Sequence, residues 1–180
     1  QGFYLGEHGW FDKRFIYDES FKTPLLIQWP GHIAPGSTND EMVQNLDFAQ
    51  TLLEVADIKA PEDMQGESLL SLLKGEDTWT REAVYYHYYE YPAVHMVKRH
   101  FGIVSQAYKL VHFYYDVDEW ELYDRMKDPS ELNNVYDDPA YASIVIQLKL
   151  ELKDMRIKYQ DSEELDQEFI EVYFDNGWVE

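Results

Sequence analysis

Four short runs of aromatic and β-branched residues constrain the fold more than any other feature of this sequence. They occupy positions 83–90, 101–104, 109–115 and 120–124, and polar residues separate them. Such a composition is typical of β-strands. The short gaps between the last three runs favour antiparallel neighbours joined in chain order. We therefore expect a four-stranded antiparallel meander between residues 83 and 124.

A long amphipathic helix is predicted to follow these strands. Asp138 and Pro139 have the residue types of an N-cap and a first helical position. Apolar side chains then recur three and four residues apart, which places them on one helical face; they are Tyr141, Ile144, Val145, Leu148, Leu152, Met155 and Tyr159. One helix packed across a four-stranded sheet gives a sufficient small core.

The first 80 residues are predicted to contain short helices joined by loops. Residues 17–21 read as one helical turn, and Asp47 with Gln50 matches a capping box for a helix at about 47–57. A second short helix is expected between Ser68, as its N-cap, and Gly75 at its C-terminal end.

Two further segments carry weaker signals. Leu25–Ile27 is expected to be a buried strand, parallel and at the edge of a larger sheet. The acidic tail after residue 160 contains interspersed aromatic residues and is expected to pack onto the body, for instance as an added strand. The composition shift at 76–82 is the best candidate for a domain boundary.

Composition and charge exclude several classes of protein. The chain has 180 residues, of which 45% are hydrophobic, and this is enough for a globular core. Its formal charge is −20, so nucleic acid and anionic lipid are poor partners. No apolar run approaches the roughly 18 residues of a transmembrane helix, and the absence of cysteine excludes a disulfide framework. The oligomeric state is left open.

The first fourteen residues contain several side chains that can bind a ligand or take part in catalysis. Gln1, Glu7, His8 and Lys13 lie among Gly2, Gly6 and Gly9. Glycines at this density let a backbone adopt positive φ or approach a ligand closely, as in loops that carry chemistry. Because the chain enters this loop with no lead-in, we expect it to be the latter part of a longer protein.

The order of residues in this stretch resembles the type I sulfatases of the alkaline-phosphatase superfamily. The resemblance is closest to N-acetylglucosamine-6-sulfatase-like enzymes and spans about residues 1–160. It is carried by Gln1-Gly2-x-x-x-Gly6-Glu7-His8-Gly9, Lys13, Tyr17-Asp18-Glu19-Ser20, Asn45–Ala49, Gln65–Leu69 and Glu119–Asp124.

This resemblance implies an α/β fold in three parts. Residues 1–80 would be the end of the N-terminal sulfatase catalytic domain, at the edge of its core sheet. Residues 81–160 would be a C-terminal subdomain with a four-stranded antiparallel sheet packed on a long helix. Residues 161–180 would be an acidic tail packed on the body.

The resemblance also implies an enzyme that hydrolyses sulfate esters, with 6-O-sulfate on an amino sugar of a glycan as the expected target. Such enzymes are periplasmic, secreted or lysosomal, and they use Ca²⁺ and a formylglycine made from Cys or Ser in a Cys/Ser-x-Pro/Ala-x-Arg motif. This chain has no cysteine and no serine in that motif. The chain alone is therefore not expected to turn over a sulfate ester.

Three site residues in the first loop are implied by the resemblance. Gln1 would offer its amide oxygen to Ca²⁺, a cation that prefers oxygen ligands. Lys13 would contact the sulfate and stabilise charge on its non-bridging oxygens, and His8 would donate to the ester oxygen or a sugar hydroxyl. The residues alone leave other readings open: Lys13 as an exposed partner of Asp12 or Glu7, and His8 as a cap for a turn.

A second basic cluster, with His95, Arg99 and His100, is expected to bind the sugar. Its alternative reading is a strand face with satisfied histidines. Two other functions also stay open at this point. One is a non-catalytic module that binds glycans or assembles with other proteins, and the other is a related phosphodiester or phosphonate monoester hydrolase.

Overall fold

The computed structural model describes residues 1–175, which divide into two compact units. Gln1–Pro24 and the residues from Ala83 onward form one unit, called here the sheet unit. Leu25–Glu82 form the other, called the helical unit. The boundary after residue 82 falls at the composition shift, whereas the boundary at residue 24 has no counterpart in the sequence prediction. The assignment of residues 1–80 to a catalytic domain stays a prediction.

The predicted meander is confirmed in the sheet unit. The strands lie in the order β3-β4-β5-β6, and every neighbouring pair is antiparallel. Their bounds are Ala83–Tyr88 (β3), His100–Ser105 (β4), Tyr108–Phe113 (β5) and Glu119–Asp124 (β6). Gly102 of β4 pairs with Val111 of β5, which in turn pairs with Glu121 of β6.

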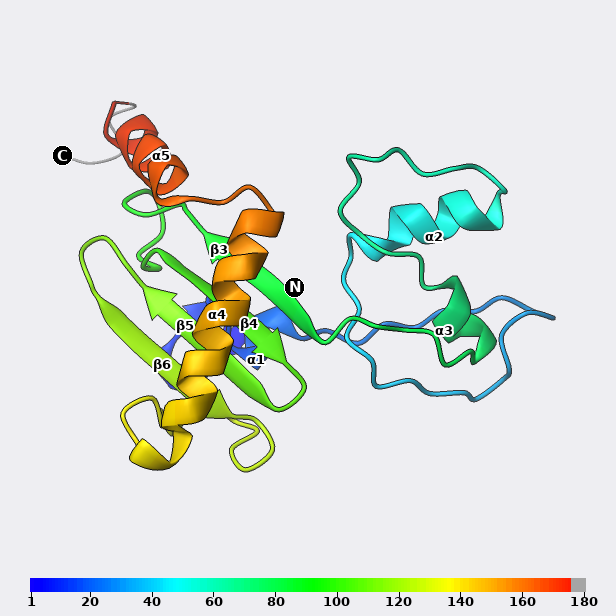
Figure 1. Ribbon diagram of the computed structural model, residues 1–180, viewed down its shortest axis with the longest axis horizontal. Coiled ribbons are helices and arrows are strands. Elements are labelled where there is room, and N and C mark those ends of the chain that lie inside the picture. The colour runs from blue at the N-terminus through cyan, green and yellow to red at the C-terminus, as the bar shows by residue number, and fades with distance from the viewer. Residues whose placement is uncertain (176–180) are drawn as a thin grey trace. The chain divides into compact units, whose positions relative to one another are not determined.

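One face of this sheet packs under the predicted long helix. α4 (Ala142–Lys158) lies across the strands (Figure 1) and follows a short 3-10 turn, η2 (Pro139–Tyr141). The Asp138 carboxylate accepts a hydrogen bond from the Ala140 N–H at 2.9 Å, so the predicted cap is formed. The core between the helix and this face consists of Phe101, Ile103, Leu110, Leu122, Leu148 and Leu152.

The opposite face is covered by the N-terminal segment. This segment contains β1 (Tyr4–Leu5), η1 (Glu7–Gly9), β2 (Phe11–Asp12) and α1 (Asp18–Phe21). Side chains alternate between the two faces of a strand, so His100 and Gly102 of β4 point to this side. Phe15 stacks on His100 with ring centroids 5.4 Å apart. A Cβ on Gly102 would lie 3.0 Å from the Ile16 side chain, so the segment sits directly on the sheet.

The helical unit contains the two predicted helices, α2 (Asp47–Val55) and α3 (Leu70–Lys74). α3 ends at Gly75 in the left-handed conformation, with φ 75°. The predicted capping box of α2 is wrong. The Asp47 carboxylate instead accepts the N–H groups of Gln44 at 2.6 Å and Glu67 at 2.8 Å, and it forms a two-point ion pair with Arg81. A fully buried carboxylate without a cation is costly in free energy, so Asp47 pairs with Arg81 instead of capping the helix.

Two other predictions of local structure are wrong. Leu25–Ile27 forms no strand, and Leu26 is 93% exposed, because no strand of the described residues pairs with it. The tail forms a helix, α5 (Glu163–Asp175), rather than an added strand. Ser162 caps it by accepting the Leu165 N–H at 3.2 Å, and acidic residues in the first turn suit the helix dipole. The rest of the predicted tail, 176–180, lies outside the described residues.

Among the described helices, none combines the length and the apolar character needed to cross a lipid bilayer.

Candidate functional site

The N-terminal loop, residues 2–14, is fastened to α1 at three points. The Gly2 N–H donates to the Ser20 carbonyl at 2.9 Å, and the Arg14 N–H donates to Ser20 Oγ at 3.0 Å. Between these ends, His8 Nε2 lies 3.2 Å from Glu19 Oε2. A Cβ on Gly2 would collide with the Glu19 carbonyl oxygen, so the approach requires glycine. The loop and α1 therefore form one structural piece.

α1 is in turn anchored to the sheet by a buried ion-pair network. The fully buried Lys109 ammonium donates to the Ile16 carbonyl, Asp18 Oδ1 and Glu131 Oε2, each at 2.8 Å. Arg125 Nη2 adds a bond to Asp18 Oδ2 at 2.8 Å. Burial opposes ionisation of Asp18, but the attraction of Lys109 and its hydrogen bond lower the pKa of that carboxyl below its usual value. The network fixes the turn that carries the loop.

The residue before Asp18 makes a separate connection. The Tyr17 hydroxyl donates to Glu121 Oε2 at 2.8 Å on β6, and burial raises the pKa of Glu121. The Tyr17 ring stacks on His8, with centroids 4.2 Å apart and planes 10° apart. The predicted candidate His8 is therefore held between a tyrosine ring and the Glu19 carboxylate.

Lys13 combines a fixed backbone with an accessible ammonium. Its neighbours Asp12 and Arg14 have φ of 91° and 99°, conformations that non-glycine residues adopt only where other contacts hold them. Arg14 provides those contacts: besides its N–H bond to Ser20, its carbonyl accepts the Tyr86 hydroxyl at 2.6 Å. The Lys13 side chain is 33% exposed, and Nζ lies 4.0 Å from Asp12 Oδ1. The side chain is therefore partly accessible.

Arg14 brings a second predicted residue, His95, to the same place. Its guanidinium pairs with Asp12 through Nη1, and its Nη2 lies 2.7 Å from His95 Nε2. Because arginine only donates, Nε2 accepts and the imidazole proton sits on Nδ1. Glu90 completes the group, 4.0 Å from Arg14 Nε. The sequence alone did not identify Arg14, Asp12 or Glu90 as members of the site.

The other predicted site residues lie elsewhere. Gln1 is exposed, whereas Arg99 and His100 are fully buried. His100 Nδ1 donates to the Lys98 carbonyl at 2.8 Å, and burial lowers the pKa of its imidazole to about 4. Its ring packs among Phe15, Tyr86, Tyr88 and Phe113. This placement agrees with the alternative reading of His100 as a histidine on a strand face in the core, with Nδ1 bonded and the buried Nε2 without a hydrogen-bond partner among the described residues, and it does not support contact with a substrate.

A calcium site is not assembled by the described residues. Calcium takes six to eight oxygen ligands, and Gln1 offers one neutral amide oxygen. The single described group of three potential metal ligands is His87, Asp161 and Asp166, whose ligand atoms lie within 4.8 Å of one another. Arg156 already neutralises both carboxylates, at 3.1 Å from Asp161 and 2.8 Å from Asp166. This cluster is a docking network for α5 rather than a metal centre.

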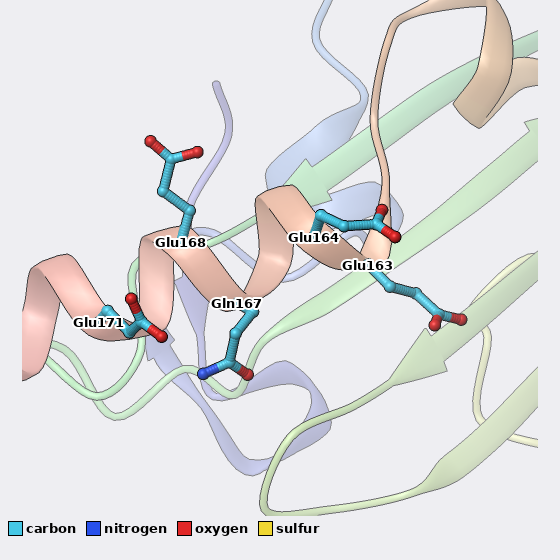
Figure 2. A pocket seen from close by; sticks show the side chains of 5 residues that line it. All are labelled: Glu163, Glu164, Gln167, Glu168 and Glu171. Carbon is cyan, nitrogen blue, oxygen red and sulfur yellow. The ribbon is translucent and has the colours of Figure 1, made fainter.

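A shallow depression on α5 is also a poor site for an anionic ligand. Its lining consists of Glu163, Glu164, Gln167, Glu168 and Glu171. Figure 2 shows these side chains spread along and around the helix instead of converging on one point. The structure therefore directs attention to the N-terminal loop and its contact with the loop that carries His95.

Comparisons with known proteins give the family of the chain. Residues 6–158 match the family described as N-sulphoglucosamine sulphohydrolase, C-terminal. The chain is similar to the N-acetylglucosamine-6-O-sulfatase of Bacteroides thetaiotaomicron, with 49% identity over 91% of this chain and 30% of that protein. It is 34% identical to human N-acetylglucosamine-6-sulfatase over 46% of this chain and 17% of that protein.

The likeness extends to three dimensions. A solved structure of a protein in complex with its substrate D-glucosamine-2-N,6-O-disulfate superposes with a TM-score of 0.86 and 49% identity. The match covers 91% of this chain and 34% of that one. The chain therefore spans about a third of the length of the bacterial relative and of this solved structure.

Proposed function

Because this chain belongs to the N-sulphoglucosamine sulphohydrolase C-terminal family, we propose that it is the C-terminal portion of a sulfatase that hydrolyses 6-O-sulfate on an amino sugar. Support for this substrate comes from the 49% identity to an N-acetylglucosamine-6-O-sulfatase and from the likeness to the glucosamine disulfate complex. The observation that carries the proposal is the partly exposed Lys13 side chain, on a loop held by the backbone bonds of the adjacent Arg14.

In this scheme Lys13 contacts the sulfate. A lysine ammonium is a compact point charge, and a fixed one stabilises the charge that grows on the sulfate oxygens in the transition state. The backbone bonds of Arg14 to Ser20 and Tyr86 hold the adjacent peptide units in place. Little reorganisation is then needed when the substrate binds.

His95 is proposed to bind a sugar hydroxyl. The Arg14 guanidinium occupies its Nε2, so Nδ1 carries the proton that can be donated to a ligand. Lys13 and Arg14 share this region with the carboxylates of Asp12 and Glu90, so the attraction for an anionic substrate would come from direct contact with Lys13 rather than from a surplus of local positive charge. Salt screens the repulsion by carboxylates more than about 10 Å away in this chain of net charge −20.

Calcium and the formylglycine nucleophile would belong to the part of the enzyme outside this chain. Calcium would neutralise sulfate charge, and Gln1, directly before the N-terminal loop, is the ligand that this chain would contribute. The proposal for this chain is therefore limited to binding and orienting the ester and stabilising its transition state.

The test is turnover by the whole enzyme with Lys13→Ala, on glucosamine 6-sulfate and on a phosphonate monoester. We expect kcat for the sulfate ester to fall at least about 100-fold, the usual loss when one transition-state contact is removed. Lys59→Ala is the matched control, because Lys59 is exposed in the helical unit and makes only a surface pair with Glu62.

Three results would contradict the proposal. An unchanged kcat in a folded Lys13→Ala enzyme would remove Lys13 from the site. Faster hydrolysis of the phosphonate would favour the related hydrolase, and tight binding of a sulfated glycan without any turnover would favour a non-catalytic module.

A further inference from the structure

Four consecutive residues, Tyr17 to Ser20, each hold a different part of the sheet unit. Tyr17 bonds Glu121 on β6, and Asp18 receives Lys109 and Arg125. Glu19 faces His8, and Ser20 receives the N–H groups of Gly2 and Arg14. The turn thus joins the sheet to both ends and the middle of the N-terminal loop.

We propose that Glu19, through its contact with His8, is a positioning residue for Lys13. This inference rests on the proposed function, because it assumes that Lys13 acts on the substrate. It also changes the expected role of His8 from direct proton donor to anchor of the loop.

The contact between Glu19 and His8 is specific. His8 Nε2 and Glu19 Oε2 are both shielded from solvent and lie 3.2 Å apart as a close polar contact, and neither atom has a hydrogen-bond partner among the described residues. The His8 side chain is only 10% exposed, and Tyr17 covers one face of its ring. Because His8 Nε2 is shielded from solvent and lies beside Glu19, it is poorly placed to give a proton to a ligand.

The loop needs an anchor between its ends because its backbone is strained along its length. Positive φ occurs at Gly6, His8, Gly9, Asp12 and Arg14. Three of these residues carry side chains, and side chains disfavour such conformations. The bonds to Ser20 secure Gly2 and Arg14. Between them, α1 reaches the loop through a side-chain hydrogen bond of Ser20 with Tyr4 and, nearer to Lys13 in the sequence, through the Glu19–His8 contact.

A loss of this anchor should affect catalysis more than stability. An exposed or partly exposed ion pair adds little to folding stability, and Glu19 is partly exposed. By contrast, a displacement of about 1 Å at a catalytic group can cost about 100-fold in rate. If Glu19 had a purely structural role, its substitution would lower stability more than it lowers kcat.

The experiment is a double-mutant cycle in the whole enzyme with Glu19→Gln, Lys13→Ala and both together, assayed on glucosamine 6-sulfate. Glu19→Gln should lower kcat about 10- to 100-fold with little change in KM, and the melting temperature should stay within about 2 °C. In the Lys13→Ala background the same substitution should have almost no further effect on kcat. Glu62→Gln, at an exposed surface pair, is the matched control.

Further variants keep the test decisive. His8→Asn should produce a loss that does not add to that of Glu19→Gln, and Glu19→Asp should restore part of the rate. Unchanged kcat in Glu19→Gln, or equal losses with and without Lys13, would overturn the positioning role while leaving Lys13 in the site. Normal turnover by Lys13→Ala would instead overturn the proposed function and this inference together.

Discussion

His100 illustrates how burial decides what a histidine does. Its ring lies among four aromatic side chains, and its Nδ1–H is satisfied by the Lys98 carbonyl. A charged imidazole would be costly in this setting, so burial lowers its pKa from the usual 6.5 to about 4. The residue belongs to the core that supports the N-terminal loop.

This shift makes stability depend on pH in a predictable direction. Between about pH 6.5 and 4 the unfolded chain binds a proton at His100 and the folded chain does not, so stability is lost as pH falls. In His100→Phe that contribution is absent. We expect the free energy of unfolding to drop by about 2 kcal/mol less between pH 7 and 5 in the variant.

Urea unfolding of both proteins at the two pH values measures the difference. The lowered pKa values of His87 and His112 contribute to both proteins and cancel in the comparison. Equal pH dependence of the two proteins would show that His100 is readily protonated in the folded state.

Some residue roles could be predicted from the sequence and others could not. The resemblance to type I sulfatases implied Lys13 as a candidate, and the structure leaves its side chain partly exposed. Lys109 and Glu131 gave no such signal, because their partnership with Asp18 depends on contacts across 91 and 113 positions. A lysine at an inward position of a strand was the only available hint.

α5 is attached to the sheet unit mainly by polar contacts near its N-terminus. Arg156 on α4 pairs with Asp161 and Asp166, and His87 Nδ1 lies 2.8 Å from Asp161 Oδ2. Burial opposes ionisation of Asp161, but hydrogen bonds from His87 and Tyr85 lower the pKa of that carboxyl. The helix therefore depends on one guanidinium to neutralise two shielded carboxylates.

Arg156→Met should release α5 without unfolding the strands. Removing one partner of a buried ion pair costs on the order of 3 kcal/mol, which corresponds to roughly 100-fold faster amide exchange in a locally opening segment. Hydrogen exchange should rise for residues 165–172 and stay unchanged in β4 and β5. Lys153→Met is the control, because Lys153 is an exposed residue of α4, the helix that carries Arg156. Uniformly faster exchange, or none, would contradict a local role.

At the scale of elements, local patterns predicted best. The meander and α4 follow from alternation and from three- and four-residue spacing within each segment, and both are confirmed. Leu25–Ile27 failed because a strand needs a partner that composition cannot supply. The tail was misread because aromatic residues among acids resemble a strand, although Ser162 and the acids after it suit a helix start.

The net charge of −20 acts on the whole molecule. Repulsion among so many carboxylates destabilises the compact state, and salt screens it. The melting temperature should therefore rise by a few degrees between about 20 and 300 mM NaCl. The double substitution Glu168→Gln with Glu171→Gln, at two exposed positions on α5, reduces the net negative charge to −18 (−20 + 2). It should make the melting temperature depend less on salt. A melting temperature that falls with salt would indicate that attractive pairs dominate.

The turn from Tyr17 to Ser20 has a consequence for how substrate preference can be redesigned or can diverge. Suppose that residues 6–14 alone are replaced by those of a relative with another substrate preference. Glu19 and Ser20 would then face residues other than the His8 and Arg14 that they contact now. Transplants should therefore carry residues 2–20 as a single cassette, together with the side chains at 109 and 121 that receive it. Point changes at partly exposed positions outside residues 2–20, such as His95, are the alternative route, because they leave the bonds made by Tyr17, Asp18 and Ser20 in place.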